Sequence, residues 1–134
     1  MVPSQALSPI GRVTFTVHLV VAVIVGLTLL LVPFTFGKLF GYPTVPGIEP
    51  PLRAFGAMIL GFGGVTSLYG ILSKKWWRVD YIVRGEIVFL ALQALVFIVS
   101  TILGSGPLLG NLVLAVVSLV LLALFLVTFI TQPK

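Results

Sequence analysis

Two ionisable residues, His18 and Glu86, stand inside long apolar stretches of the sequence and are its best candidates for chemistry. Each lies six positions beyond a charged residue near the start of its stretch, Arg12 for the first and Asp80 for the second. At a helical rise of ~1.5 Å per residue, both side chains would lie ~9 Å below the same membrane surface. An ionisable side chain at that depth needs a partner and indicates a functional site by default. We therefore weigh a structural His18–Glu86 pair against a ligand-binding or proton-transfer site.

Three polar residues extend this candidate ligand or proton site. Ser67 and Tyr69 belong to a neighbouring apolar stretch and reach about the same depth as His18 and Glu86. Gln93 follows Glu86 by seven positions, so the two side chains share one face of a helix. Because lipid offers no hydrogen bonds, we expect this polar face to turn toward the interior of a bundle.

Other kinds of active centre find little support in the sequence. His18 is the one histidine, and a haem or pigment would have to be ligated through it. The chain has no cysteine, and one histidine with three acidic residues cannot build a conventional metal cluster. No recognisable catalytic motif is present, so we do not expect an enzyme. The sequence requires no cofactor.

These residues must be positioned by four apolar segments, residues 9–32, 52–73, 81–103 and 107–131. Each has the ~20 residues that a helix needs to cross a bilayer. The chain of 134 residues is 59% hydrophobic and only 8% charged, and its mean hydropathy is +1.25. A soluble domain of this size would need far more polar surface. The sequence predicts an all-α fold, an integral membrane four-helix bundle that forms a single transmembrane domain over residues 1–134.

The connections differ in character. Residues 33–51 form a long predicted outer loop that is rich in proline, glycine and aromatic residues. Residues 74–80 are short, basic and aromatic, and we expect them to form a loop after which Asp80 caps the third helix. Ser8 precedes Pro9 and predicts a capped start of the first helix.

The basic residues predict an orientation with both termini inside, N-in and C-in. Four spans place six basic residues on the side of the termini and two on the side of the outer loop, and the positive-inside rule assigns the richer side to the cytoplasm. The six are Arg12, Lys74, Lys75, Arg78, Arg84 and Lys134, and the two are Lys38 and Arg53. The same rule and anionic lipid headgroups explain the net charge of +5, so we expect no nucleic-acid partner.

Small residues predict where the helices pack. Gly56, Gly63 and Gly70 recur every seven positions, and Ala22 and Gly26 follow His18 at steps of four. Helices in membranes approach each other closely where such small residues line up. We expect these two lines to mark packing seams.

Two short stretches resemble a known group of proteins. They are Leu39–Pro43 (LFGYP) after the first segment and Arg53–Ala57 (RAFGA) at the start of the second, followed by Trp76 and Trp77. This layout resembles the small four-helix membrane proteins of bacteria and archaea that are grouped as DoxX-like and related families. The resemblance implies a four-helix bundle and, because some members are linked to respiratory or sulfur-oxidising membrane complexes, a place beside such a complex. It implies no catalytic residue.

The sequence thus favours a small multi-pass protein of a prokaryotic cell membrane that is a non-catalytic accessory or structural subunit of a larger complex, such as a respiratory or electron-transfer complex. One alternative is a binding protein or transporter for a lipophilic small molecule, such as a quinone, a lipid or a drug-like compound, in the bundle groove. The other is a haem or pigment protein that uses His18. We expect membrane lipids and other membrane subunits, or a second copy of the chain, as partners.

Overall fold

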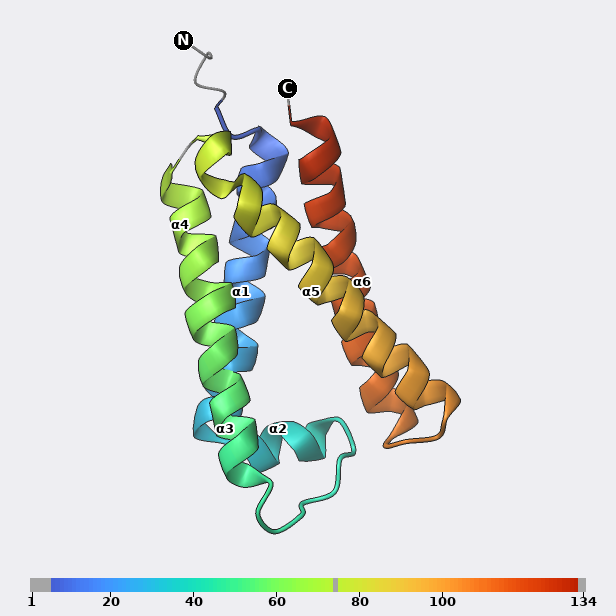
Figure 1. Ribbon diagram of the computed structural model, residues 1–134. Coiled ribbons are helices and arrows are strands. Elements are labelled where there is room, and N and C mark those ends of the chain that lie inside the picture. The colour runs from blue at the N-terminus through green and yellow to red at the C-terminus, as the bar shows by residue number, and fades with distance from the viewer. Residues whose placement is uncertain (1–5, 74, 133–134) are drawn as a thin grey trace.

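The structure, a computed structural model, describes residues 6–73 and 75–132 and is a bundle of helices (Figure 1). Lys74 and Lys134, which contribute to the predicted charge balance, lie outside the described residues. The elements in chain order are α1 (Pro9–Leu31), α2 (Pro33–Leu39), α3 (Glu49–Met58), the π-helix η1 (Ile59–Gly64), α4 (Val65–Ser73), α5 (Trp76–Ile102) and α6 (Leu108–Thr131). The predicted all-α fold is confirmed.

Among the described residues, four helical segments are long and apolar enough to cross a membrane: Pro9–Leu31, Glu49–Ser73, Trp76–Ile102 and Leu108–Thr131. The second of them is the continuous run of α3, η1 and α4. Large apolar side chains cover the outside of all four, for example Ile24 (61% exposed), Phe62 (71%), Ile102 (76%) and Ile130 (74%). Such a surface is stable against lipid and not against water, which is consistent with a multi-pass membrane protein.

The third span begins earlier than the sequence indicated. Helix α5 starts at Trp76, so residues 76–80 are helical and Asp80 does not cap the helix. Instead, Asp80 accepts a hydrogen bond from Arg84 Nε at 3.0 Å, one turn later. The added turn is stabilised by this i,i+4 ion pair and by Val79, which is fully buried. The predicted outer loop also contains a helix, α2, which begins at Pro33.

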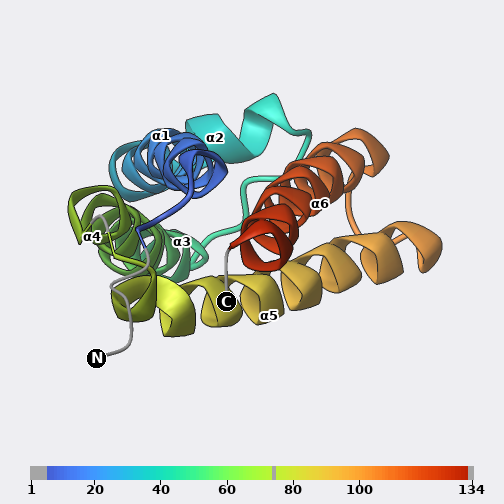
Figure 2. The same ribbon diagram turned by 90° about the horizontal axis from the view of Figure 1, so that it is seen from above.

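The helices form two antiparallel hairpins, one of α1 with the second span and one of α5 with α6 (Figures 1 and 2). Glycines allow the close approach within the first hairpin. A Cβ on Gly56 would lie 2.7 Å from Leu30 N and 2.8 Å from Gly26 O, so the two backbones are in direct contact there. At Gly70 the neighbour is a side chain: the Phe15 ring packs directly against the glycine and leaves no room for a Cβ.

The hairpins are joined tightly at the end that carries the described termini. Thr14 Oγ1 and Thr128 Oγ1 share a hydrogen bond of 2.8 Å between α1 and α6. The Phe15 and Phe125 rings meet edge to face, with centroids 5.6 Å apart. Gln132 accepts a hydrogen bond from Ser8 N and donates one to the Ala6 carbonyl. These contacts fix the helices to one another at this end, which we call the terminal end.

At the opposite end, which we call the loop end, α5 runs away from α3, and the segment between α2 and α3 bridges the hairpins (Figure 1). Tyr42 in this segment donates a hydrogen bond of 2.6 Å to Asn111 Oδ1 at the start of α6. Asn111 Nδ2 in turn donates to the Ser105 carbonyl at 2.9 Å. Burial raises the pKa of the Tyr42 phenol, so the phenol remains a donor to a higher pH than an exposed tyrosine would. The bridge therefore holds together an end where the helices themselves diverge.

Candidate functional site

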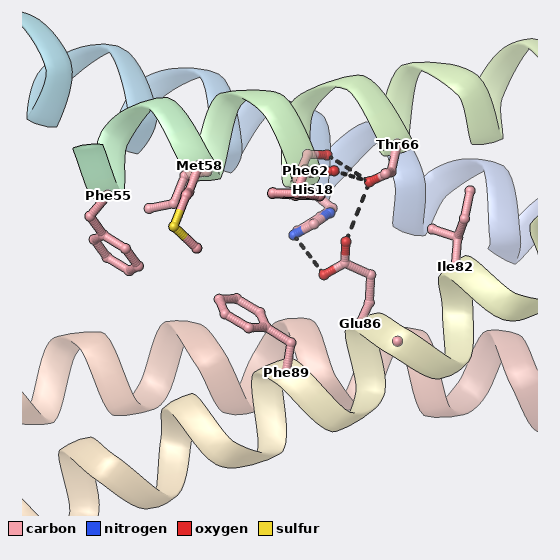
Figure 3. Close-up of a pocket in the computed structure, with 11 residues that line it drawn as sticks. His18, Phe55, Met58, Phe62, Thr66, Ile82, Glu86 and Phe89 are labelled. Atoms are coloured by element: carbon pink, nitrogen blue, oxygen red, sulfur yellow. Dashed lines mark hydrogen bonds and ion pairs between the residues drawn. The ribbon is translucent and has the colours of Figure 1, made fainter. Parts of the chain in front are cut away.

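The site is built around His18, which projects from α1 between the second span and α5 (Figure 3). The residue is 6% exposed. Its Nδ1 lies 2.8 Å from Ser67 Oγ of α4, and its Nε2 lies 3.7 Å from Glu86 Oε2 of α5. The ring of Phe125 from α6 supports the imidazole edge to face at 5.2 Å. One histidine thus connects side chains from three other spans.

Glu86 has room for a further hydrogen-bond donor. The separation of 3.7 Å from His18 Nε2 is longer than a hydrogen bond. Its other oxygen, Oε1, lies 3.4 Å from Thr66 Oγ1, but the single Thr66 hydroxyl hydrogen has a closer acceptor in the Phe62 carbonyl of the same span. Both contacts of the carboxyl group with protein donors are therefore long, 3.4 Å to Thr66 Oγ1 and 3.7 Å to His18 Nε2.

A cavity of about 310 Å³ lies next to these side chains. Its volume is within the ~300–1,000 Å³ typical of small-molecule sites. Apart from the imidazole, the carboxyl group and the Thr66 hydroxyl, its wall is apolar, with three phenylalanine rings (Figure 3). The lining residues are His18, Phe55, Met58, Ile59, Phe62, Gly63, Thr66, Ile82, Gly85, Glu86 and Phe89. We call this the His18–Glu86 cavity.

The π-helix η1 forms one wall of the His18–Glu86 cavity through Ile59, Phe62 and Gly63. Such wide turns inside α-helices are rare and occur frequently at functional sites. Here the wide turn ends two residues before Thr66, the residue that faces Glu86 across the cavity.

A second cavity of about 400 Å³ continues toward the loop end, between α2, α3 and α5. We call it the outer cavity. Phe55 and Ile59 line both cavities, so the two are neighbours. Gln93 and Phe97 of α5, Tyr42 and residues of α2 form part of its wall. Together the cavities follow the space that opens where α5 diverges from α3.

The structure brings together three of the five predicted site residues, His18, Ser67 and Glu86. Gln93 lies two turns further along α5 and lines the outer cavity instead. Tyr69 is 45% exposed and lines neither cavity. The predicted packing residues lie between α1 and the second span, where Gly63 faces Ala22 and a Cβ on Gly63 would be 3.3 Å from the Ala22 Cβ.

The sequence reasoning missed Thr66 and the phenylalanine rings as parts of the site. A usable signal existed for one wall, because positions 55, 59, 62 and 66 follow steps of four, three and four and therefore share a helix face. Phe89 likewise lies one turn after Glu86. These residues look like ordinary lipid-facing side chains in spans where most positions are apolar.

Metal or haem ligation gains no support from this geometry. Within residues 6–73 and 75–132, no cluster of three or more metal-ligating side chains occurs. Both nitrogens of His18 face protein partners, Ser67 and Glu86, so binding iron would require breaking one of these contacts. We therefore do not propose a haem or pigment.

Comparison of the chain with protein-family models, curated proteins and solved structures gives no match. The DoxX-like resemblance of the two short stretches stays a prediction.

Proposed function

We propose that the chain is a multi-pass protein of a prokaryotic cell membrane that binds a lipophilic small molecule in the His18–Glu86 cavity. The observation that carries the proposal is an ionisable pair, His18 and Glu86, lining an otherwise apolar cavity among membrane-length helices. Ionisable groups at such positions are costly in a bilayer and commonly mark sites for substrates, ions or protons.

The arrangement of the helices supports entry of a ligand from the membrane. Helix α5 packs against α6 and leaves α3 along the half of the bundle near the loop end (Figure 1). The rim of the cavity is apolar, with Met58 (51% exposed) and Phe62 (71%) on the second span and Phe89 (44%) on α5. A molecule dissolved in lipid would reach Glu86 between these side chains without crossing water.

Filling the cavity tests the proposal. Gly85 lines the cavity, and a Cβ there would meet no atom within 4 Å, so Gly85→Leu should fold and occupy part of the space. Gly61 is equally unobstructed but lines neither cavity, which makes Gly61→Leu the matched control.

The measurement is native mass spectrometry of the purified protein with three dodecyl probes, dodecyltrimethylammonium, dodecanol and dodecanoate. We expect at least one probe to bind one-to-one to the wild type and to Gly61→Leu, and to be lost from Gly85→Leu. If none binds, or if Gly85→Leu binds the probes as the wild type does, the proposed function is wrong.

The accessory-subunit hypothesis is a second proposal, supported by one feature of the surface. Gly61 is exposed, and a Cβ there would meet nothing within 4 Å, so the outer side of η1 is open to close approach by another helix. Purification in mild detergent at native expression tests it. A stoichiometric membrane partner that is lost from Gly61→Leu would support the proposal, and a lone chain would contradict it.

A further inference from the structure

We propose that the molecule bound in the His18–Glu86 cavity is an organic ammonium ion on a single apolar chain, with its head group held by the Glu86 carboxylate beside the rings of Phe62 and Phe89. This inference rests on the proposed function and adds the chemical class of the ligand. Three features carry it: the charge of the wall, the aromatic rings, and the continuation of the space into the outer cavity.

The charges of the wall favour a cation. Glu86 is the one acidic residue in the lining, and the lining contains no lysine or arginine that could neutralise a carboxylate or phosphate ligand. Arg84, the nearest basic residue along α5, is engaged elsewhere, with Asp80 and over the ring of Phe129 at 4.8 Å. An anionic head group would be repelled by Glu86 and find no counter-charge, whereas a cation would supply the partner that a carboxylate in an apolar cleft needs.

His18 is not a hydrogen-bond partner of the Glu86 carboxylate. Its Nδ1 is engaged by Ser67 at 2.8 Å, and its Nε2 is 3.7 Å from Glu86 Oε2, which is too long for a hydrogen bond. The carboxylate consequently remains open on its cavity side. The imidazole lies beside Oε2 and the Thr66 hydroxyl beside Oε1, both at long distances, so either oxygen can accept a shorter contact from a ligand.

Two aromatic rings near the carboxylate strengthen the preference for a cation. Phe62 of η1 lies one turn before Thr66 and Phe89 of α5 lies one turn after Glu86, so a ring stands on each side of the cleft near the carboxylate, whereas Phe55 of α3 lies further toward the outer cavity (Figure 3). The face of an aromatic ring attracts a cation within about 6 Å, and groups of rings are a recurrent way to bind quaternary ammonium ions. A neutral alcohol could bond to Glu86 but would gain nothing from the ring faces.

The outer cavity gives the apolar part of the ligand a place. It shares Phe55 and Ile59 with the His18–Glu86 cavity and reaches Phe97. Along α5, the path from Glu86 to Phe97 measures roughly 16 Å at a helical rise of ~1.5 Å per residue. A flexible unbranched chain follows this space along the helix, while a compact ligand would leave the outer cavity empty.

The three dodecyl probes test whether the ligand is cationic, neutral or anionic, because they share one alkyl chain and differ in the charge of the head group. Offered at equal concentration, dodecyltrimethylammonium should bind best to the wild type. Glu86→Gln keeps the shape of the side chain and removes its charge. It should weaken ammonium binding by roughly thirtyfold or more, the fold-change that corresponds to loss of one partner of a buried charge pair.

Two further variants make the test specific. Phe89→Leu preserves apolar contact and removes one ring, so it should weaken the ammonium probe and leave dodecanol unchanged. Glu49→Gln is the matched control, because Glu49 pairs with Arg53 near the loop end and lines neither cavity. It should bind all three probes as the wild type does.

The possible failures are distinguishable. If dodecanol or dodecanoate binds the wild type as well as the ammonium probe does, or if Glu86→Gln binds the ammonium probe unchanged, the ligand class is wrong. If Gly85→Leu nevertheless abolishes probe binding, the proposed function remains supported and only the ligand class is wrong. The ranking of probes on the wild type needs no variant, so the test does not depend on whether Glu86→Gln folds.

Discussion

Replacing Gly56 by alanine should separate the two helices of the first hairpin. The added Cβ would lie 2.7 Å from Leu30 N, 2.8 Å from Gly26 O and 2.9 Å from Leu29 Cβ. Two of these atoms belong to the backbone of α1, which cannot escape by a change of rotamer. The strain can be relieved only by moving one helix away from the other.

The magnitude follows from two opposing terms. Overpacking a tight interface costs about 1–3 kcal/mol, and contact with a backbone places this site at the upper end. Alanine in place of glycine returns about 1 kcal/mol of helix propensity. We therefore expect Gly56→Ala to lower the free energy of unfolding by ~2 kcal/mol. Gly61→Ala, where the Cβ meets nothing within 4 Å, should keep the propensity gain alone.

Reversible unfolding in mixed micelles, with rising sodium dodecyl sulfate followed by far-ultraviolet circular dichroism, measures the difference between the two variants. The midpoint of Gly56→Ala should fall below that of the wild type, and the midpoint of Gly61→Ala should equal or exceed it. If Gly56→Ala proves as stable as Gly61→Ala, the helices do not approach each other as closely as described, and the packing of the first hairpin is wrong.

Three further predictions concern the bridge, the imidazole and the orientation. Tyr42→Phe removes the hydrogen bond to Asn111, so amide exchange in residues 40–48 should quicken about fivefold, as loss of ~1 kcal/mol implies; unchanged exchange would show that the bridge does not depend on this bond. Ser67→Ala leaves the imidazole Nδ1 without its partner and should lower the free energy of unfolding by about 1–3 kcal/mol in the same micelle assay, and a neutral result would mean that the ring finds another partner. Because the chain has no cysteine, single Lys38→Cys and Lys75→Cys variants can be labelled in whole cells with an impermeant maleimide; Lys38→Cys should react directly and Lys75→Cys only after permeabilisation, and the reverse pattern would refute the N-in, C-in orientation.

The fold was predictable because its cause is local to each segment. Four apolar runs of bilayer length leave the backbone no alternative to helix, since lipid cannot satisfy its polar groups. The start of α1 was predictable as well. Ser8 Oγ accepts a hydrogen bond from Gly11 N, as expected for a capping serine before Pro9. The start of α5 was not, because a short basic aromatic stretch is typical of a loop, and the contacts of the buried Val79 that favour helix are tertiary.

The site was predictable only in part for a related reason. Equal depth along two spans predicted that His18 and Glu86 lie close together, and His18 Nε2 lies 3.7 Å from Glu86 Oε2. Depth gives no information about the rotation of a helix, which is why Tyr69 seemed a candidate although it turns toward the surface. Gln93 shares a face with Glu86, but α5 diverges from α3 along its length, so one face of α5 lines two cavities. The sequences of α3 and α5 contain no pattern from which the divergence of the two helices could be predicted.

The hydrogen bonds of Gln132 have a consequence for how the protein is made. This side chain holds the backbone of Ala6 and Ser8, yet it is synthesised after all four spans. During translation the first hairpin must therefore enter the bilayer with its leading end untied, and the second hairpin must follow before the ends can meet. Assembly of the two halves is thus a late step within the membrane, and it can be completed only after the whole of α6 and Gln132 has left the ribosome.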